Sequence, residues 1–160
     1  MEPRIIHIGA KKLIGQHVLM SLADNRTFEL WRGFMPRRKE ITNNLNTDLI
    51  SMKVCHEPVD IGRMDQLHEK WAAIEVSSFE FVPPDMETFE LPGGTYAVFH
   101  YKGLNTDPRI FIYIFTDWLP NSEYELDDRP HFEILGVKYK NNDPDSEEEI
   151  YIPVRPKSER

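Results

Sequence analysis

The sequence of 160 residues contains only one cysteine, Cys55, and no apolar run that approaches the length of a membrane span. A lone cysteine excludes a disulfide framework and a structural zinc site built on cysteines. The first residues, Met1-Glu2-Pro3-Arg4, also lack the basic segment and the apolar stretch of a signal peptide. We therefore expect a cytoplasmic protein that does not insert into membranes.

Basic residues are scarce as well, since 19 Lys and Arg stand against 27 Asp and Glu and give a net charge of −8 at pH 7. Such a chain repels a phosphate backbone, so direct binding to nucleic acid is disfavoured. The sequence also lacks a serine nucleophile elbow, a phosphate-binding glycine loop and a cysteine nucleophile constellation. His131-x-Glu133 begins like a zinc deaminase motif, but no Pro-Cys-x-x-Cys follows it. We expect neither a cofactor nor a metal.

The main positive feature of the chain is a repeated pattern. An aromatic segment of the first half recurs in the second half at a constant offset: Phe28, Trp31 and Phe34-Met35-Pro36 match Ile112, Phe115 and Trp118-Leu119-Pro120. A strand-like stretch precedes each aromatic segment, and two more apolar stretches follow it. The pattern predicts two strand-helix-strand-strand halves, at residues of about 5–78 and 86–156, within one domain spanning 1–160. Two such halves normally pack about a pseudo-two-fold axis and leave a cleft along the seam.

Helices are expected at residues 26–35 and 108–119, where apolar residues recur at helical spacing. Pro36 should end or bend the first helix. Both helices should lie on the same side of the sheet, because each half has one apolar helix and cannot bury it alone. Strands are expected at residues 5–21 as a bent or bulged pair, and at 49–55, 71–77, 96–103, 131–139 and 148–154.

Several segments of the second half follow one another in the order of a known family: residues 94–99, 102–103, 117–122, 129–133 and 149–154. On these segments the chain resembles the GyrI-like small-molecule-binding family, which includes the effector-binding domains of AraC-type and MerR-type multidrug-responsive regulators. The first half matches through its pattern and its place in the duplication. The resemblance implies an α+β fold of duplicated β-α-β-β modules, with an antiparallel sheet and two helices bordering a central ligand groove.

The resemblance also implies the ligand class, because family members bind cationic, amphipathic or aromatic compounds and use an acidic groove residue to neutralise the ligand charge. Glu133 matches that position. No helix-turn-helix module precedes the domain, so we expect a stand-alone member. Stand-alone members include a DNA gyrase inhibitor and hydrolases of cyclopropane-bearing natural products.

Strand alternation places Glu133 on the same face as His131 and Leu135, with Phe132 and Ile134 on the other face. A carboxylate among aromatic residues is costly unless it meets a cation, a hydrogen-bond donor or a proton. Two structural alternatives stay open: an exposed charge on an open sheet face, or a carboxylate bonded to a nearby tyrosine.

Six further side chains are predicted to line the groove as stacking surfaces, hydroxyl donors or an adaptable wall: Trp118, Trp31, Phe34, Tyr113, Tyr151 and Met52. Aromatic stripes at helical spacing usually belong to a core, and only those facing the seam between the halves are expected to contact a ligand. The sequence therefore favours a module that binds a small amphipathic, aromatic or cationic compound, as a sensor or sequestrant. The alternatives are a hydrolase of strained electrophiles that uses Glu133, and an interaction protein that docks on DNA gyrase or a regulator.

Overall fold

The computed structural model describes residues 2–60 and 62–157. As predicted, the chain begins with a bent pair of strands, β1 (Arg4–Ile8) and β2 (Lys11–Met20). The first helix, α1 (Thr27–Phe34), continues as the 3-10 helix η1 (Met35–Glu40), because Pro36 has no backbone N–H to donate. Strands β3 (Leu49–Val54) and β4 (His68–Val76) complete the first half.

The second half repeats this sequence of elements. It begins with β5 (Glu87–Leu91) and β6 (Gly94–Lys102). A continuous helix follows, composed of α2 (Arg109–Tyr113), the π-helical turn η2 (Ile114–Trp118) and α3 (Leu119–Asn121). The chain then forms β7 (Tyr124–Leu126), β8 (His131–Leu135) and β9 (Glu147–Pro156).

Three details differ from the sequence prediction. Strands β5 and β7 were not predicted, because each is short and gains its hydrogen bonds from a strand distant in sequence, β2 and β9 respectively. The strand predicted at residues 131–139 ends at Leu135, and the chain turns at Gly136, whose carbonyl accepts a hydrogen bond from the Tyr139 N–H.

The strands of the described residues pair in the order β1-β6-β9-β8-β3-β4-β2-β5, with β7 beside β9, and every pairing is antiparallel. The two halves hold equivalent positions in this order, since β2, β4 and β3 correspond to β6, β9 and β8. The first strand of each half crosses to the other half, where β1 pairs with β6 and β5 with β2. This order places a pseudo-two-fold axis between β3 and β8, as the sequence predicts.

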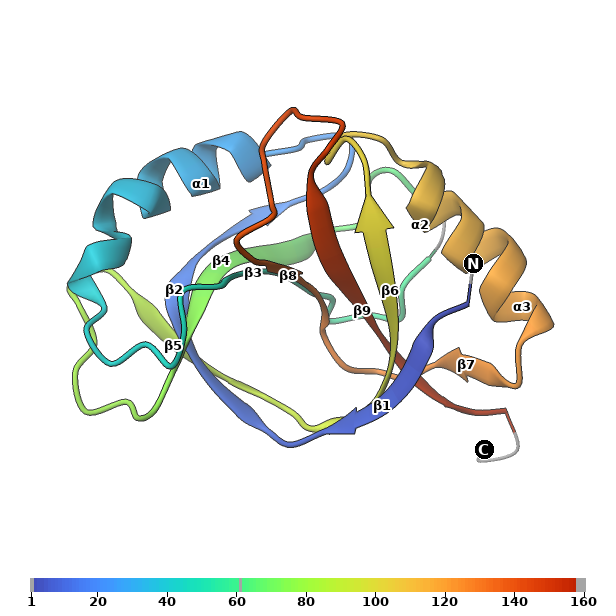
Figure 1. Cartoon of the computed structure of the whole chain (residues 1–160), viewed down its shortest axis with the longest axis horizontal. Coiled ribbons are helices and arrows are strands. Elements are labelled where there is room, and N and C mark those ends of the chain that lie inside the picture. Colours follow the sequence, from blue (N-terminus) through green and yellow to red (C-terminus); the bar gives the residue numbers. More distant parts are fainter. Residues whose placement is uncertain (1, 61, 158–160) are drawn as a thin grey trace.

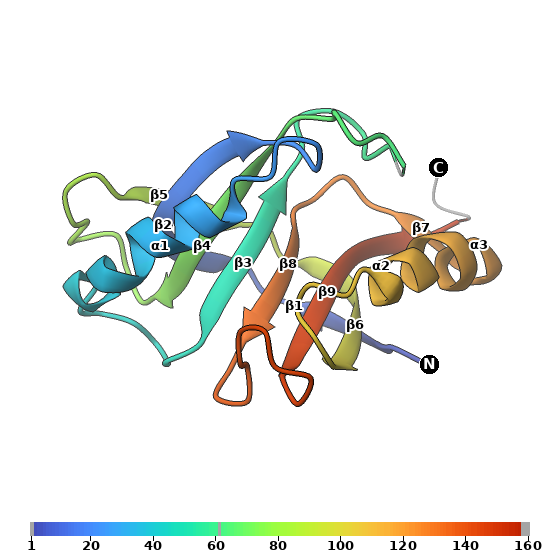
Figure 2. The same cartoon turned by 90° about the horizontal axis from the view of Figure 1, so that it is seen from above.

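Both helices cover the same face of the sheet, again as predicted. Leu30 of α1 packs with Ala72 of β4, and Ile114 of η2 packs with Ile150 of β9. Figure 1 shows α1 and α2 on one side of the curved sheet, and Figure 2 shows β3 and β8 lying between them. The helices therefore flank the central strands and leave part of that face to other side chains.

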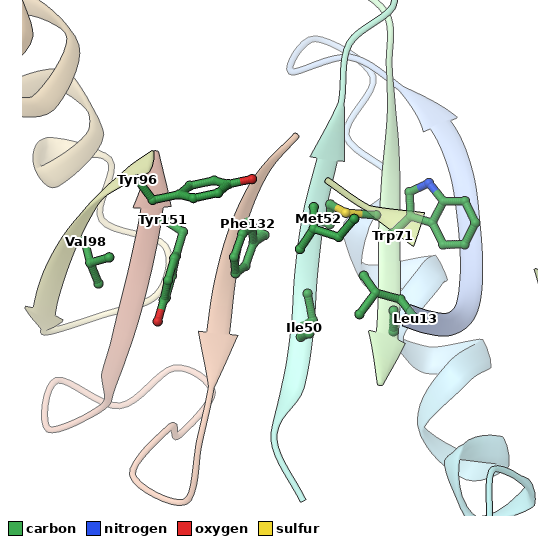
Figure 3. Close-up of a cluster of buried hydrophobic side chains, with 10 residues drawn as sticks. Leu13, Ile50, Met52, Trp71, Tyr96, Val98, Phe132 and Tyr151 are labelled. Atoms are coloured by element: carbon green, nitrogen blue, oxygen red, sulfur yellow. The ribbon is translucent and has the colours of Figure 1, made fainter. Parts of the chain in front are cut away.

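The opposite, inner face of the sheet carries a separate apolar cluster, shown in Figure 3. Its aromatic rings contact one another: Tyr151 stacks on Phe132 with ring centroids 4.5 Å apart, and Tyr96 meets both rings edge-on. Met52 of β3 lies beside Phe132 in the strand register. The β1–β6 and β2–β5 pairings supply Val98, Leu13 and other residues of this cluster, so the exchange of first strands completes the inner core.

Candidate functional site

The face between the two helices is polar where the central strands cross it. Residues of β3 and β8 alternate between faces, and Met52 and Phe132 belong to the inner cluster, so their neighbours in each strand point to the helix side. The register aligns Lys70, Lys53 and His131 in one row and Ser51 with Glu133 in the next. We call these five residues, together with Glu148 of β9, the central strip.

Two carboxyl groups meet within the central strip. Glu148 is 6% exposed and is hydrogen-bonded with the half-buried Glu133 of the neighbouring strand. Burial, followed by the charge and hydrogen bond of Glu133, raises the pKa of Glu148 to about 9. Glu148 is therefore protonated at neutral pH and donates its proton to Glu133. The pair carries a single negative charge.

Tyrosine side chains flank this carboxyl pair. Tyr101 of β6 is the cross-strand partner of Glu148, and its hydroxyl donates to the Leu104 carbonyl at 2.8 Å. Tyr139 lies in the turn after β8, and burial together with the charges of Glu148 and Glu133 raises its pKa. Burial is the first cause of the raised pKa of Glu148 as well, so this end of the central strip is poorly hydrated.

A positively charged row crosses the central strip beside the carboxyl pair. Lys53 pairs with Lys70 on one side and with His131 on the other. Burial and the charge of Lys53 lower the pKa of His131 to about 4. The buried His68 at the start of β4 also has a pKa of about 4, because of burial and the two lysines. Both imidazoles are neutral at pH 7, so the lysines carry the positive charge of this row.

The second helix brings an aromatic ring to the same row. The ring of Phe115 lies 6.0 Å from that of His131, centroid to centroid, and is half-buried. In the repeated pattern Phe115 corresponds to Trp31 of α1, which is also half-buried. Trp31 packs edge-on against Phe34 at 5.9 Å. Each helix thus supplies one half-buried aromatic ring at equivalent positions.

The other predicted site residues on the helices take part in helix packing. Phe34 is fully buried against the sheet under α1. Trp118 meets Phe99 at 5.2 Å and Tyr124 at 6.4 Å, toward β6 and β7. Tyr113 packs against the same cluster under the second helix. Their contacts with a ligand stay predictions, since the observed contacts are those of a core.

Met52 and Tyr151 lie on the inner face of the sheet, opposite to Glu133. Met52 is fully buried, and Tyr151 is 9% exposed. Tyr151 is therefore not the tyrosine that could bond to Glu133, because such a hydrogen bond would have to pass through the sheet. The structure gives both residues packing roles beneath the central strip, and their contact with a ligand stays a prediction.

A shallow hollow of about 270 Å³ lies beside α1, away from the central strip. Its lining is largely polar and includes His17, Glu29 and Glu87. None of the seven predicted site residues lines it. Nδ1 of His17 and a carboxylate oxygen of Glu87 approach each other to 2.9 Å there.

The sequence prediction missed Glu148, Lys53 and Lys70. A signal for Glu148 was present, because alternation along β9 places it on the same face as Ile150 and Ile152, which are buried. A charged residue in that pattern needs a partner. The two lysines gave no such signal, since their proximity depends on the register between β3 and β4.

In the described part of the chain, no helix has the length and apolar character needed to cross a membrane.

Comparison with known proteins places these features in a family. A model of the family described as "Cass2: Integron-associated effector binding protein" matches residues 4–154. The transcriptional regulator BrlR of Pseudomonas aeruginosa is 28% identical over 158 residues, which is 96% of this chain and 56% of BrlR. The chain thus spans little more than half the length of that relative.

Solved structures of similar proteins share the fold. The integron cassette protein VCH_CASS2 of Vibrio cholerae has a TM-score of 0.68 at 16% identity, covering 97% of each chain. The structure of SAV2435 bound to tetraphenylphosphonium has a TM-score of 0.61 at 16% identity, covering 97% of this chain and 94% of the other. The match over residues 4–154 agrees with the GyrI-like resemblance of the sequence, and the chain belongs to the Cass2 family of integron-associated effector-binding proteins.

Proposed function

We propose that this protein binds a small amphipathic, aromatic or cationic compound on the central strip and acts as a sensor or sequestrant of that compound. The observation that carries the proposal is the carboxyl pair of Glu133 and Glu148, which shares a proton and keeps one negative charge on a partly desolvated face. A charge in that setting is costly unless a counter-charge approaches it. Within the described residues Glu133 forms no ion pair, and an organic cation would supply a direct one.

Similar proteins support this ligand class. SAV2435, which shares the fold, is described as bound to tetraphenylphosphonium, an aromatic cation. The aromatic rings of Phe115 and Trp31 stand on the two helices that flank the central strip. Such rings offer stacking and cation–π contacts to a flat or phenyl-rich cation.

We further propose that one domain composed of both halves forms the site, with Tyr113, Trp118 and Phe34 holding the helices in place around it. We also propose a cytoplasmic location, which is what the sequence predicts. The resemblance to BrlR covers only 56% of that regulator, so a role in transcription and a partner such as a regulator or DNA gyrase are part of this proposal.

Hydrolysis of a strained electrophile is the second candidate function, and the same carboxyl pair favours it. A protonated Glu148 beside Glu133 offers an acid and a base within hydrogen-bond reach of each other. Mass spectrometry after incubation with a cyclopropane-bearing electrophile separates the two functions. Turnover that is lost in Glu133→Gln would establish the hydrolase, whereas unchanged ligand at stoichiometric occupancy would establish the binder.

Calorimetric titration with tetraphenylphosphonium and with the neutral triphenylphosphine oxide tests the binding proposal. Glu133→Gln should weaken binding of the cation by roughly 1–3 kcal/mol and barely affect binding of the neutral compound. A charge-assisted contact is lost in this variant, while the shape of the side chain is kept. Burial is the largest cause of the raised pKa of Glu148 and is kept in this variant, so Glu148 is expected to stay protonated and not to replace the lost charge. The double variant Glu133→Gln/Glu148→Gln checks this point.

Glu90→Gln is the matched control, since Glu90 is exposed on β5 and the variant changes the net charge equally. It should bind both compounds as the wild type does. If Glu133→Gln lowers the affinity for the cation and for the neutral compound equally, Glu133 has a structural role and the proposal is refuted.

A further inference from the structure

Two lysines face each other across the central strip. Lys53 of β3 and Lys70 of β4 are directly opposite in the register, and both are half-buried. Side chains at such positions start about 5 Å apart, and like charges placed there destabilise a sheet. An arrangement of this kind calls for a compensating anion.

Within the described residues, the negative charge of the central strip is that of Glu133, which lies in the adjacent row and not opposite either lysine. Neither lysine side chain has an ion pair or a hydrogen bond in the part of the chain that the structure describes, in contrast to Lys11, whose ammonium nitrogen lies 3.4 Å from a Glu75 carboxylate oxygen. The charge of Lys70 reaches Glu148 and lowers its pKa slightly, but burial and Glu133 outweigh this effect and keep Glu148 protonated at neutral pH. Burial and the charge of Lys70 lower the pKa of Lys53, and the adjacent Cys55 thiol also has a pKa raised by burial.

The remaining groups of the row add no negative charge. His131 pairs with Lys53 in the register, and His68 lies near both lysines, but both imidazoles are neutral. The ring of Phe115 lies beside His131 and adds an apolar surface at the His131 end of the row. The row is therefore a small positive site with an aromatic wall.

We propose that Lys53 and Lys70 bind an oxyanion, so that the preferred ligand is an aromatic zwitterion whose cationic end lies at Glu133. This inference rests on the proposed function and adds a second charge to its ligand. His131 is paired with Lys53 and lies two residues from Glu133 along β8, a separation of about 7 Å. That distance corresponds to opposite ends of a para-substituted benzene ring.

Three probes separate the two charges: para-aminomethylbenzoate carries both, its methyl ester only the cation, and para-methylbenzoate only the oxyanion. Calorimetric or NMR titration of the wild type should show the zwitterion binding at least about tenfold more tightly than the ester. Titration with a fourth compound, para-aminomethylphenylphosphonate, shows whether the site binds a phosphate-like group more tightly than the carboxylate of para-aminomethylbenzoate. Tighter binding of the phosphonate would assign the natural ligand to organic phosphates, and weaker binding would assign it to carboxylates.

Lys53→Met removes the charge and keeps most of the side-chain stem. This variant should abolish the advantage of the zwitterion and leave the affinity for the ester unchanged or slightly improved. Lys70→Met should act in the same direction. Lys39→Met is the control, because Lys39 is exposed in η1 and the variant changes the net charge by the same amount.

Equal binding of the zwitterion and the ester to the wild type, with Glu133-dependent binding of the ester, would overturn the oxyanion site and leave the proposed function standing. Lysine-dependent binding of para-methylbenzoate without any binding of the ester would support the oxyanion site and refute the cation proposal. Thermal unfolding of each variant without ligand confirms that it is folded. Lys53→Met should melt at the wild-type temperature or above it, because the like-charge contact is removed.

Discussion

Glu148 on β9 donates its carboxyl proton to Glu133 on the adjacent β8, on the sheet face that carries both helices. A chain with an excess of acidic residues thus places one neutral carboxyl group in a buried position at the centre of its candidate site. The shared proton reduces the charge of the pair to −1, so its ionisation can be followed in both stability and ligand binding.

The first prediction concerns the pH dependence of stability. The pKa of Glu148 is about 9 in the folded protein against an ordinary value of 4.5. Between these values the folded state holds a proton that the unfolded state has lost, so the free energy of unfolding falls as pH rises. His68 and His131, with a pKa of about 4 against 6.5, act in the opposite sense between those two values. Stability should peak near pH 6.5 and then fall toward pH 9 by about 1 kcal/mol per pH unit.

Urea denaturation across this pH range measures the effect. Glu148→Gln should remove the alkaline fall, because glutamine keeps the shape and a donor toward Glu133 but does not ionise. Glu90→Gln should retain the wild-type profile. An alkaline fall of the same size in Glu148→Gln would assign the effect to another group.

The second prediction compares two glycines. A Cβ atom on Gly15 of β2 would lie 2.0 Å from the Ala72 carbonyl oxygen and 2.7 Å from Ala73 Cα on β4, and rigid backbone cannot move away. Gly15→Ala should therefore lower the free energy of unfolding by about 3 kcal/mol or more. A Cβ atom on Gly33 of α1 meets nothing within 4 Å, so Gly33→Ala should stabilise by up to about 1 kcal/mol through helix propensity.

Urea midpoints of both variants decide this comparison. Similar midpoints for Gly15→Ala and the wild type would mean that β2 and β4 are farther apart than the structure shows. A loss of stability in Gly33→Ala would mean that α1 contacts another surface at this position.

The third prediction separates the aromatic residues of the two faces. Phe132 is 2% exposed in the inner cluster, so Phe132→Ala should lower the free energy of unfolding by about 3–5 kcal/mol. Phe115→Ala should cost only about 1–2 kcal/mol, since Phe115 is half-buried. Where the Phe115→Ala variant is folded, it should bind tetraphenylphosphonium more weakly than the wild type by about 0.5–1.5 kcal/mol.

Calorimetric titration at a temperature where both variants are folded provides the measurement. If Phe115→Ala binds tetraphenylphosphonium with wild-type affinity, the Phe115 ring of the second helix does not contact the ligand. Tyr151→Phe tests the ligand contact that the sequence predicts for Tyr151: wild-type affinity for the cation is expected from its place on the inner face, and a loss of affinity would support the contact.

Some sequence motifs reflect contacts that only the structure reveals. The family-like segments contain Gly94 and Arg129, and Arg129 donates to Asp127 at 2.8 Å and to the Thr95 carbonyl at 2.7 Å. A Cβ atom on Gly94 would lie 2.4 Å from Nη1 of Arg129, and the φ of Gly94 is +147°. Glycine is favoured there because its φ is positive, and any other side chain would also have to displace the guanidinium group from its hydrogen bonds.

The sequence by itself determined the local features of this protein. The repeated aromatic segments predicted two helices, and alternation correctly placed His131, Glu133 and Leu135 on one face of β8. These features depend on the spacing of apolar residues within a few turns or strand positions, which a single sequence records directly. Membership of the effector-binding family was likewise visible in the motifs of the second half.

Only the tertiary structure decided which distant residues meet. Strand order and register bring Glu148 to Glu133 and Lys53 to Lys70, and they send Tyr151 and Met52 to the inner face. The aromatic residues of the helices were ambiguous in the sequence, because the same spacing suits a core and a ligand wall. Pairing between strands far apart in the chain depends on how both halves pack at once, and this cooperative arrangement leaves no local pattern in the sequence.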